Sequence, residues 1–190
     1  MLNGLTSLLT SWATRRNVLI LVALELAMSA ALLPLAAARL SVLSGGVGPL
    51  DAPFTYTPAQ AYSDLAAYGP AGREFDLSTR LTLNLVYPVV YSLFFSLASL
   101  YFLQRAAPGR PGLARLALLP FLALLADTLQ NAGLIVLLLG YPAQLPAVAV
   151  ATSLLTSIKW FLQAISLVLL VLSAVGALLA RRQRIDPAQP

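Results

Sequence analysis

The chain has 190 residues, of which 59% are hydrophobic and only 10% charged, and its formal net charge is +5. Soluble domains usually carry about 25% charged residues and expose a large area to water, so this composition excludes an ordinary soluble fold and predicts an integral membrane protein. The sequence has no cysteine and no histidine, which excludes disulfides, thiolate or imidazole metal sites and Ser-His-Asp catalysis. We expect neither a metal site nor a cofactor.

Residues 1–14 carry apolar side chains at helical spacing, namely Leu2, Leu5, Leu8, Leu9 and Trp12. This pattern predicts either a short amphipathic helix on the inner membrane surface or an N-terminal extension of the first span. Arg15 and Arg16 also resemble a twin-arginine export signal, with a cleavage site at residues 36–38. The apolar run between them exceeds the about 7–15 residues of a signal peptide and contains Glu25, so we interpret it as a retained span.

Four segments have the roughly 20 mostly apolar residues that a membrane-spanning helix needs. They run from about residue 17 to 38, 81 to 103, 116 to 139 and 149 to 180. We treat residues 1–190 as a single transmembrane domain with these four spans and one sizeable segment outside them, residues 41–78.

The arginines predict the orientation of the spans. They cluster before the first span, between the second and third, and after the fourth: Arg15, Arg16, Arg105, Arg110, Arg115, Arg181, Arg182 and Arg184. Because the chain crosses the membrane four times, all three clusters lie on the same side. Short loops rich in arginine and lysine face the cytoplasm. We therefore expect a multi-pass protein of the cell inner (plasma) membrane with both termini cytoplasmic. Membrane lipids, rather than nucleic acid, are the expected partner of the positive charge, and a homo-oligomer is an open alternative.

Residues 41–78 predict a helical cap over the outer mouth of the bundle. Thr57-Pro58 predicts a helix start and Gly69-Pro70 its end, because a hydroxyl caps the first turn and proline suits its first position. One face of this helix carries Ala61, Tyr62, Leu65 and Ala66. A second helix is expected from about residue 71 straight into the second span. The segment is either a lid on a binding site or a packed loop that seals helix ends.

Aromatic residues of the cap are expected in the lipid headgroup layer, where an amphipathic ring is well accommodated. They are Tyr56, Tyr62 and Tyr68.

Every span carries a stripe of polar residues, most of them three, four or seven positions apart. The stripes are Glu25, Ser29 and Arg39 in the first span, Arg80, Asn84, Tyr87 and Tyr91 in the second, Asp127, Gln130 and Asn131 in the third, and Thr152, Thr156, Lys159, Gln163, Ser166 and Ser173 in the fourth. Heptad spacing indicates left-handed packing at about 20°, and polar groups in hydrocarbon must find partners. The sequence therefore predicts an all-α, integral membrane, left-handed four-helix bundle with a polar interior and a short helical extracytoplasmic cap.

Inside this bundle we expect Lys159 to pair with Asp127, while Gln130, Asn131 and Gln163 complete the hydrogen bonds. Glu25 either joins them or keeps its proton. A charge at the centre of a span costs about 2.5–3.5 kcal/mol, so several charges persist only when they are paired or useful. The candidate residues for ligand binding or a buried polar network are Glu25, Arg80, Asn84, Tyr87, Tyr91, Asp127, Gln130, Asn131, Thr156, Lys159 and Gln163.

The leading hypothesis for function is a non-enzymatic membrane protein that binds a small or lipid-like ligand in this interior, or that serves as an accessory subunit. Pro34, Pro88 and Pro120 fall within spans, and a kink at Pro88 would widen the interior. One alternative is that the polar network only sets helix register. Another is an enzyme acting on a lipid or isoprenoid, with Asp127 or Glu25 as acid or base and Lys159 stabilising charge. The last is a proton or ion path, against which the apolar stretch 167–172 argues.

Several stretches of the chain resemble an uncharacterised family of bacterial four-span membrane proteins. They are residues 68–73 (YGPAGR), 83–88 (LNLVYP) with Tyr91, 126–131 (ADTLQN) and 158–160 (IKW). The resemblance spans nearly the whole chain and implies the same four-span fold, but no activity. In that family the positions of Asn84 and Gln130 are often acidic, which puts in doubt any role needing two further carboxylates. A fainter likeness is to the sterol-isomerase and sigma-2-receptor type of bundle, which also buries carboxylates and amides.

Overall fold

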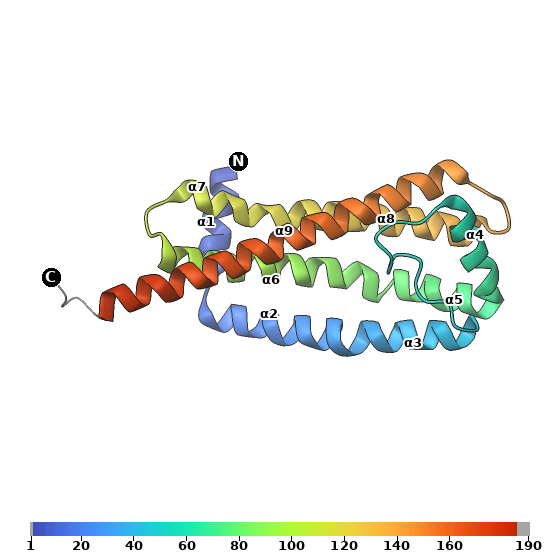
Figure 1. Ribbon diagram of the computed structural model, residues 1–190, viewed down its shortest axis with the longest axis horizontal. Coiled ribbons are helices and arrows are strands. Elements are labelled where there is room, and N and C mark those ends of the chain that lie inside the picture. Colours follow the sequence, from blue (N-terminus) through green and yellow to red (C-terminus); the bar gives the residue numbers. More distant parts are fainter. Residues whose placement is uncertain (1, 186–190) are drawn as a thin grey trace.

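The computed structural model describes residues 2–185, and every regular element in that range is a helix. Four long helical segments dominate, and they can be followed in Figure 1. The first is α2 (Arg15–Ala27) continued by a π-helical turn η1 (Met28–Leu32) and α3 (Leu33–Leu43), and the others are α6 (Leu83–Ala106), α8 (Leu119–Gly140) and α9 (Pro146–Ile185). Each is long and apolar enough to cross a membrane. The all-α helical bundle predicted from the sequence is confirmed, and its four apolar helices fit a multi-pass membrane protein.

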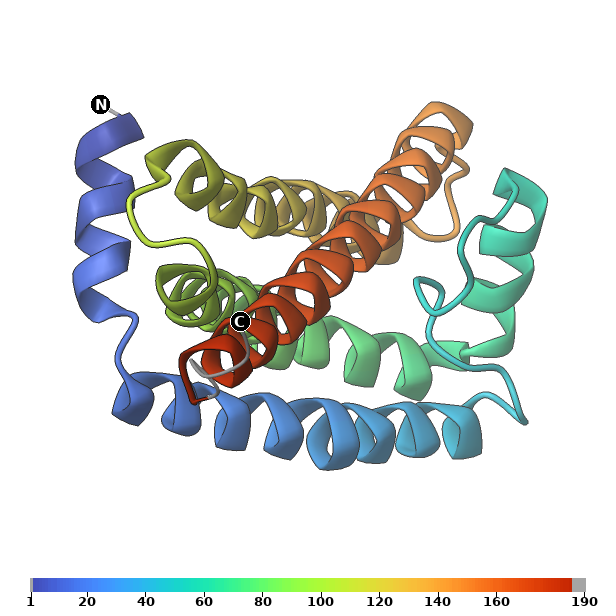
Figure 2. The same cartoon turned by 60° about the vertical axis from the view of Figure 1, so that its left-hand side comes forward.

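The N-terminal residues form a separate helix, α1 (Leu2–Trp12). The chain turns at Ala13, and Thr14 caps the start of α2 by accepting a hydrogen bond from the Asn17 amide at 3.3 Å. Figure 2 shows α1 standing across the direction of α2. The alternative of an extension of the first span is therefore wrong. Side chains of Leu5, Leu8 and Trp12 are exposed, while Leu9 is buried.

Helices α6, α8 and α9 pack against one another, and α2 packs mainly on α6. Small residues allow the close approaches: Ser92, Ser96 and Ser99 on α6 are fully buried, and Ser92 donates a hydrogen bond to the carbonyl of Pro120 at 2.9 Å. A Cβ at Gly133 on α8 would lie 2.3 Å from Oγ1 of Thr152 on α9. The architecture is therefore a three-helix core with the first helix at its side, since few side chains of α2 and α3 are buried.

Two helix boundaries differ from the prediction, and the first span contains a π-helical turn. The second helix does not run straight out of the cap, because α5 (Gly69–Arg80) ends and α6 begins after a turn at Leu81 and Thr82. The short α7 (Pro111–Ala114) and a 3₁₀ turn η2 (Arg115–Leu118) precede α8. Pro120 therefore lies in the first turn of α8, where the N–H that proline lacks would have no helical partner. The π-helical turn ends just before Pro34, and such turns relieve the lost helical hydrogen bond.

The predicted cap is present as α4 (Pro58–Ala67) and α5. Thr57 and Gln60 form a capping box at the start of α4, and Gly69 takes a positive φ of 62° where α4 gives way to α5. Ala61, Tyr62 and Leu65 face inward, but Ala66 is exposed.

The three tyrosines of the cap do not lie where the sequence suggested. Tyr56, Tyr62 and Tyr68 are buried in an apolar cluster that joins the cap to the ends of α8 and α9. Two of the three hydroxyl groups form hydrogen bonds within the protein. The Tyr68 hydroxyl donates to the carbonyl of Gly48 at 2.8 Å, and the Tyr62 hydroxyl accepts from the Leu145 amide. Packing under the cap therefore overrides the preference of tyrosine for headgroups.

The two ends of the bundle differ in charge. Figure 1 shows α1, α7 and the end of α9 together at one end, and α4 and α5 at the other. The first we call the basic end, because it carries Arg15, Arg16, Arg105, Arg110, Arg115, Arg181 and Arg182; the side chain of Arg184 lies outside the described residues. The second we call the cap end. A further apolar cluster of α1, α2, α6 and η2 residues packs near the basic end.

Candidate functional site

The polar layer between the two apolar clusters centres on Lys159 of α9. Its ammonium has three N–H donors and meets three acceptors. These are Oε1 of Gln130 at 2.9 Å, Oδ2 of Asp51 at 3.2 Å and Oδ1 of Asp127 at 3.5 Å. Lys159 is only 5% exposed. Its charge is thus balanced by one carboxylate from α8 and one from the loop that follows the first helix.

Asp51 connects Lys159 to a second buried cation, Arg80 at the end of α5. Oδ1 of Asp51 lies 2.9 Å from Nη2 of Arg80, and Oδ2 of Asp76 lies 3.2 Å from its Nε. Arg80 is 1% exposed. The ionic cluster, defined as Asp51, Asp76, Arg80, Asp127 and Lys159, therefore joins the cap, α8 and α9 through three carboxylates and two cations.

Electrostatics around Asp51 favour its charged form. Burial alone would raise the pKa of this carboxyl, but the adjacent charges of Arg80 and Lys159 and their hydrogen bonds outweigh burial and hold the pKa well below its usual range. Asp51 lies outside the four spans, so its loop brings a permanent negative charge to the end of the polar layer.

The expected pairing of Lys159 with Asp127 is present, but Lys159 lies closer to Asp51 than to Asp127. Gln130 accepts from Lys159 as expected. Asn131 instead donates to the backbone carbonyl of Arg80 at 3.0 Å, and so fixes the end of α5 against α8.

Two tyrosines of α6 extend the polar layer toward the first helix. Tyr91 is 1% exposed and donates to Oδ2 of Asp127 at 3.2 Å. Tyr87 donates to Oε1 of Glu25 at 3.0 Å, and the two rings meet edge to face at 5.3 Å. Glu25 therefore does not contact Lys159 or Asp127 directly, and the tyrosine pair stands between it and the ionic cluster.

Two residues of the predicted stripes take other places. Arg39 is exposed, so the inward stripe of the first helix ends before it. Thr156 is fully buried, but its hydroxyl donates to the Thr152 carbonyl of its own helix at 3.0 Å. Threonine hydroxyls in membrane helices often donate to a backbone carbonyl of their own helix. Helical periodicity alone does not distinguish such a threonine from one that bonds to a neighbouring helix.

The loop that carries Asp51 is held along α9 by a ladder of hydrogen bonds. Trp160 donates to the Asp51 carbonyl at 3.4 Å, and Ser157 donates to the Phe54 carbonyl at 2.8 Å. The Tyr56 amide then donates to the Ser153 hydroxyl at 2.9 Å. Because 153, 157 and 160 lie on one face of a helix, the loop runs as a strap along that face. The strap is defined as residues 51–56.

A cavity of about 460 Å³ lies beside the ionic cluster. The first helix supplies an apolar wall, whereas α5, α6, α8 and α9 supply polar and charged side chains, and the strap segment adds Asp51 and Ala52. The residues that line the cavity include Leu33, Pro34, Ala36, Ala37, Leu40, Asn84, Tyr87, Trp160 and Gln163, together with all five members of the ionic cluster. The cavity is therefore amphipathic.

Some buried polar atoms of the described residues have no protein partner. Among them are Nη1 of Arg80, Nε2 of Gln130 and Oδ1 of Asn131. A buried donor left unsatisfied costs about 1–3 kcal/mol, more when it is charged.

Sequence reasoning missed Asp51 and Asp76. Asp76 could have been found, because it lies four residues before Arg80 on a helix, a spacing that brings opposite charges together. Asp51 left no such signal, since a loop's path depends on tertiary contacts. Among the described residues, no group of three or more His, Cys, Asp or Glu side chains is arranged to hold a metal ion.

Comparison with known proteins adds no function to this geometry. No protein-family model, no curated protein and no solved structure matches the chain.

Proposed function

We propose that this protein binds an amphipathic, lipid-like molecule in the cavity between its first helix and its three-helix core. The observation that carries the proposal is the contrast between the walls: Leu33, Ala37 and Leu40 face Asp51, Arg80 and Lys159 across one space. Ligand sites are mostly apolar with a few convergent polar groups, in volumes of about 300–1,000 Å³. The apolar part of the ligand lies along α3, and its polar head lies at the ionic cluster.

The chemistry of the ionic cluster indicates what that head carries. Lys159 already meets three acceptors, and Arg80 is already paired with two carboxylates, so both cations at the polar wall are balanced within the protein. Three carboxylates surround two cations, which disfavours a further full negative charge. A hydroxyl, carbonyl or ester oxygen fits this environment better than a phosphate.

We further propose that the protein resides in the cell inner (plasma) membrane with both termini in the cytoplasm. The arginine-rich basic end would then face the cytoplasm and the cap end would face outward, as the positive-inside rule expects. The cavity would lie in the outer half of the bilayer, beneath the strap and the cap.

A cavity-filling substitution tests ligand binding. Ala37 lines the cavity, whereas its neighbour Ala38 is exposed and does not, so Ala38→Trp is a matched control for Ala37→Trp. The delipidated protein is mixed with neutral lipid fractions from membranes, and its thermal unfolding is followed. A ligand at 100 times its Kd stabilises by about 2.7 kcal/mol. We expect stabilisation of the wild type and Ala38→Trp but not of Ala37→Trp. Equal responses in all three, or none in any, would refute the proposal.

A further inference from the structure

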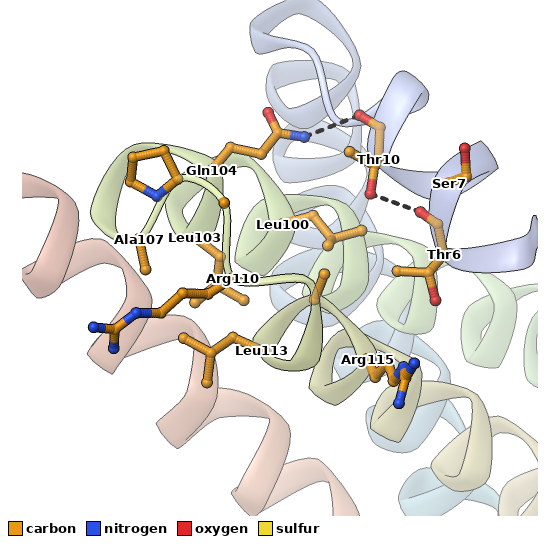
Figure 3. A pocket seen from close by; sticks show the side chains of 13 residues that line it. Thr6, Ser7, Thr10, Leu100, Leu103, Gln104, Ala107, Arg110, Leu113 and Arg115 are labelled. Carbon is orange, nitrogen blue, oxygen red and sulfur yellow. Dashed lines mark hydrogen bonds between the residues drawn. The ribbon is translucent and has the colours of Figure 1, made fainter. Parts of the chain in front are cut away.

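A second cavity lies at the basic end, far from the ionic cluster. It has a volume of about 480 Å³ and lies between α1, the end of α6 and the α6–α8 connection. Its lining combines hydroxyls and an amide, two arginines and an apolar floor: Thr6, Ser7, Thr10, Gln104, Arg110, Arg115, Leu100, Leu103 and Leu113. Figure 3 shows the hydroxyl-bearing residues of α1 on one wall and Arg110 and Arg115 on either side of Leu113.

The wall formed by α1 has a mixed inward face, because both Thr6 and Leu9 are buried. On this face Gln104 donates to the Thr10 carbonyl at 3.1 Å and Thr10 donates to the Thr6 carbonyl at 2.6 Å. Its opposite face exposes Leu5, Leu8 and Trp12 by 45%, 52% and 55%. A helix with exposed leucines and a tryptophan lies in the plane of the membrane interface. The pocket behind it is therefore at the level of lipid head groups.

Within the described part of the chain, the charged side chains that line this pocket are arginines. Arg110 and Arg115 line it, and Arg105 lies nearby in sequence at the end of α6. Among the described residues, the acidic side chains belong to the middle of the bundle or to the cap end: Glu25, Asp51, Asp64, Glu74, Asp76 and Asp127. Arginine is suited to phosphate, because its planar guanidinium donates in pairs, and basic pockets at a membrane surface bind anionic head groups.

We propose that this pocket binds one anionic phospholipid, such as phosphatidylglycerol, by its head group. The negatively charged head group lies between Arg110 and Arg115, the α1 hydroxyls and Gln104 contact its polar part, and an acyl chain begins on Leu100, Leu103 and Leu113. This site differs from the amphipathic cavity in place and in charge, and it does not depend on the proposed function. It would fix α1 to the membrane and to the loop between α6 and α8.

Native mass spectrometry of the full chain in mild detergent tests the site, with phosphatidylglycerol or phosphatidylcholine added. Each arginine near a membrane surface contributes about 1 kcal/mol, so loss of two lowers affinity for an anionic lipid by about 30-fold. We expect saturable binding of one phosphatidylglycerol to the wild type, an about 30-fold loss in Arg110→Gln/Arg115→Gln, and a smaller loss in Arg110→Lys/Arg115→Lys, which keeps the charges without the paired donors. The matched control Arg181→Gln/Arg182→Gln removes the same charge from the same end outside the pocket.

Three outcomes would overturn this site. One is an equal loss in the control pair, which would mean diffuse attraction without a pocket. Another is equal binding of phosphatidylcholine. The last is displacement of the lipid by soluble glycerol phosphate at similar concentration, which would make the ligand a free phosphate compound. Thermal unfolding of each variant before lipid addition separates loss of binding from loss of fold, and the lysine variant retests the site if the glutamine variant unfolds.

Discussion

Nζ of Lys159 and Oδ2 of Asp51 lie 3.2 Å apart although the two residues are 108 positions apart in the chain. Asp51 comes from a loop and Lys159 from α9, so this ion pair ties the strap to the core. Asp51 also binds Arg80 at the end of α5, which brings the cap into the same cluster. The polar interior is thus stabilised from outside the four spans as well as from within them.

Removing the central cation leaves two carboxylates short of a partner. We expect Lys159→Met to destabilise the folded protein by about 3–5 kcal/mol, since breaking a buried ion pair on one side leaves an uncompensated charge. Denaturant unfolding in detergent measures the change. Adding Asp127→Asn should recover part of the loss, because the double variant no longer buries that unpaired carboxylate. If the two substitutions are additive, Lys159 and Asp127 are not coupled.

The stability contributed by Asp51 depends on pH in a defined direction. Its pKa in the folded protein is below the value of about 3.9 expected for an unfolded chain, so its carboxylate stabilises the fold above about pH 4. This stabilisation is lost as the pH falls through the folded pKa. Thermal unfolding at pH 7 and pH 3 should show a large deficit for Asp51→Asn at pH 7 and a smaller one at pH 3. A deficit that stays constant would contradict the ionic role of Asp51.

Tyr91 and Tyr87 on α6 should contribute differently to the free energy of unfolding. Tyr91 is almost fully buried and bonds Asp127, so Tyr91→Phe should cost about 1–1.5 kcal/mol. Tyr87 is half-buried and bonds Glu25, so Tyr87→Phe should cost about 0.5 kcal/mol or less. The same unfolding measurement ranks both variants, and a larger loss for Tyr87→Phe would reverse the order we assign.

The contact between α8 and α9 requires glycine at position 133. Alanine normally stabilises a helix relative to glycine by about 1 kcal/mol, but here its Cβ would meet Oγ1 of Thr152 at 2.3 Å. Overpacking of this kind costs about 1–3 kcal/mol, so Gly133→Ala should be destabilising. Gly112→Ala is the control, because nothing lies within 4 Å of its added Cβ. Thr152→Ala should partly rescue the first variant, and a stabilised Gly133→Ala would show that the helices do not approach so closely.

Much of the bundle could be predicted because a membrane imposes simple rules on sequence. The length of the apolar segments identified the helices that can cross a membrane. The helical spacing of the polar residues led to the prediction that Lys159 pairs with Asp127. The amphipathic pattern of residues 1–14 predicted α1 as one of two alternatives, although which face would turn inward was not evident.

The remainder depends on contacts that no local pattern encodes. The path of the strap places Asp51 beside Lys159. Packing under the cap buries Tyr56, Tyr62 and Tyr68 in an apolar cluster. The amphipathic cavity lies where the first helix packs at the side of the other three. The four polar stripes predicted a four-helix bundle with a polar interior, but not this lateral position of the first helix. Tertiary packing, rather than periodicity, therefore decides where the candidate site lies.

Binding of an amphipathic molecule in the cavity is tested most directly by native mass spectrometry of protein purified in mild detergent without delipidation. A lipid that depends on Arg110 and Arg115 belongs to the pocket at the basic end, so all spectra are recorded in the Arg110→Gln/Arg115→Gln background. We predict one additional retained mass, of a neutral amphipathic molecule, on the protein with the native alanines and on Ala38→Trp, and its absence from Ala37→Trp. A protein that retains no such mass, or that retains it equally in Ala37→Trp, would contradict the proposed function.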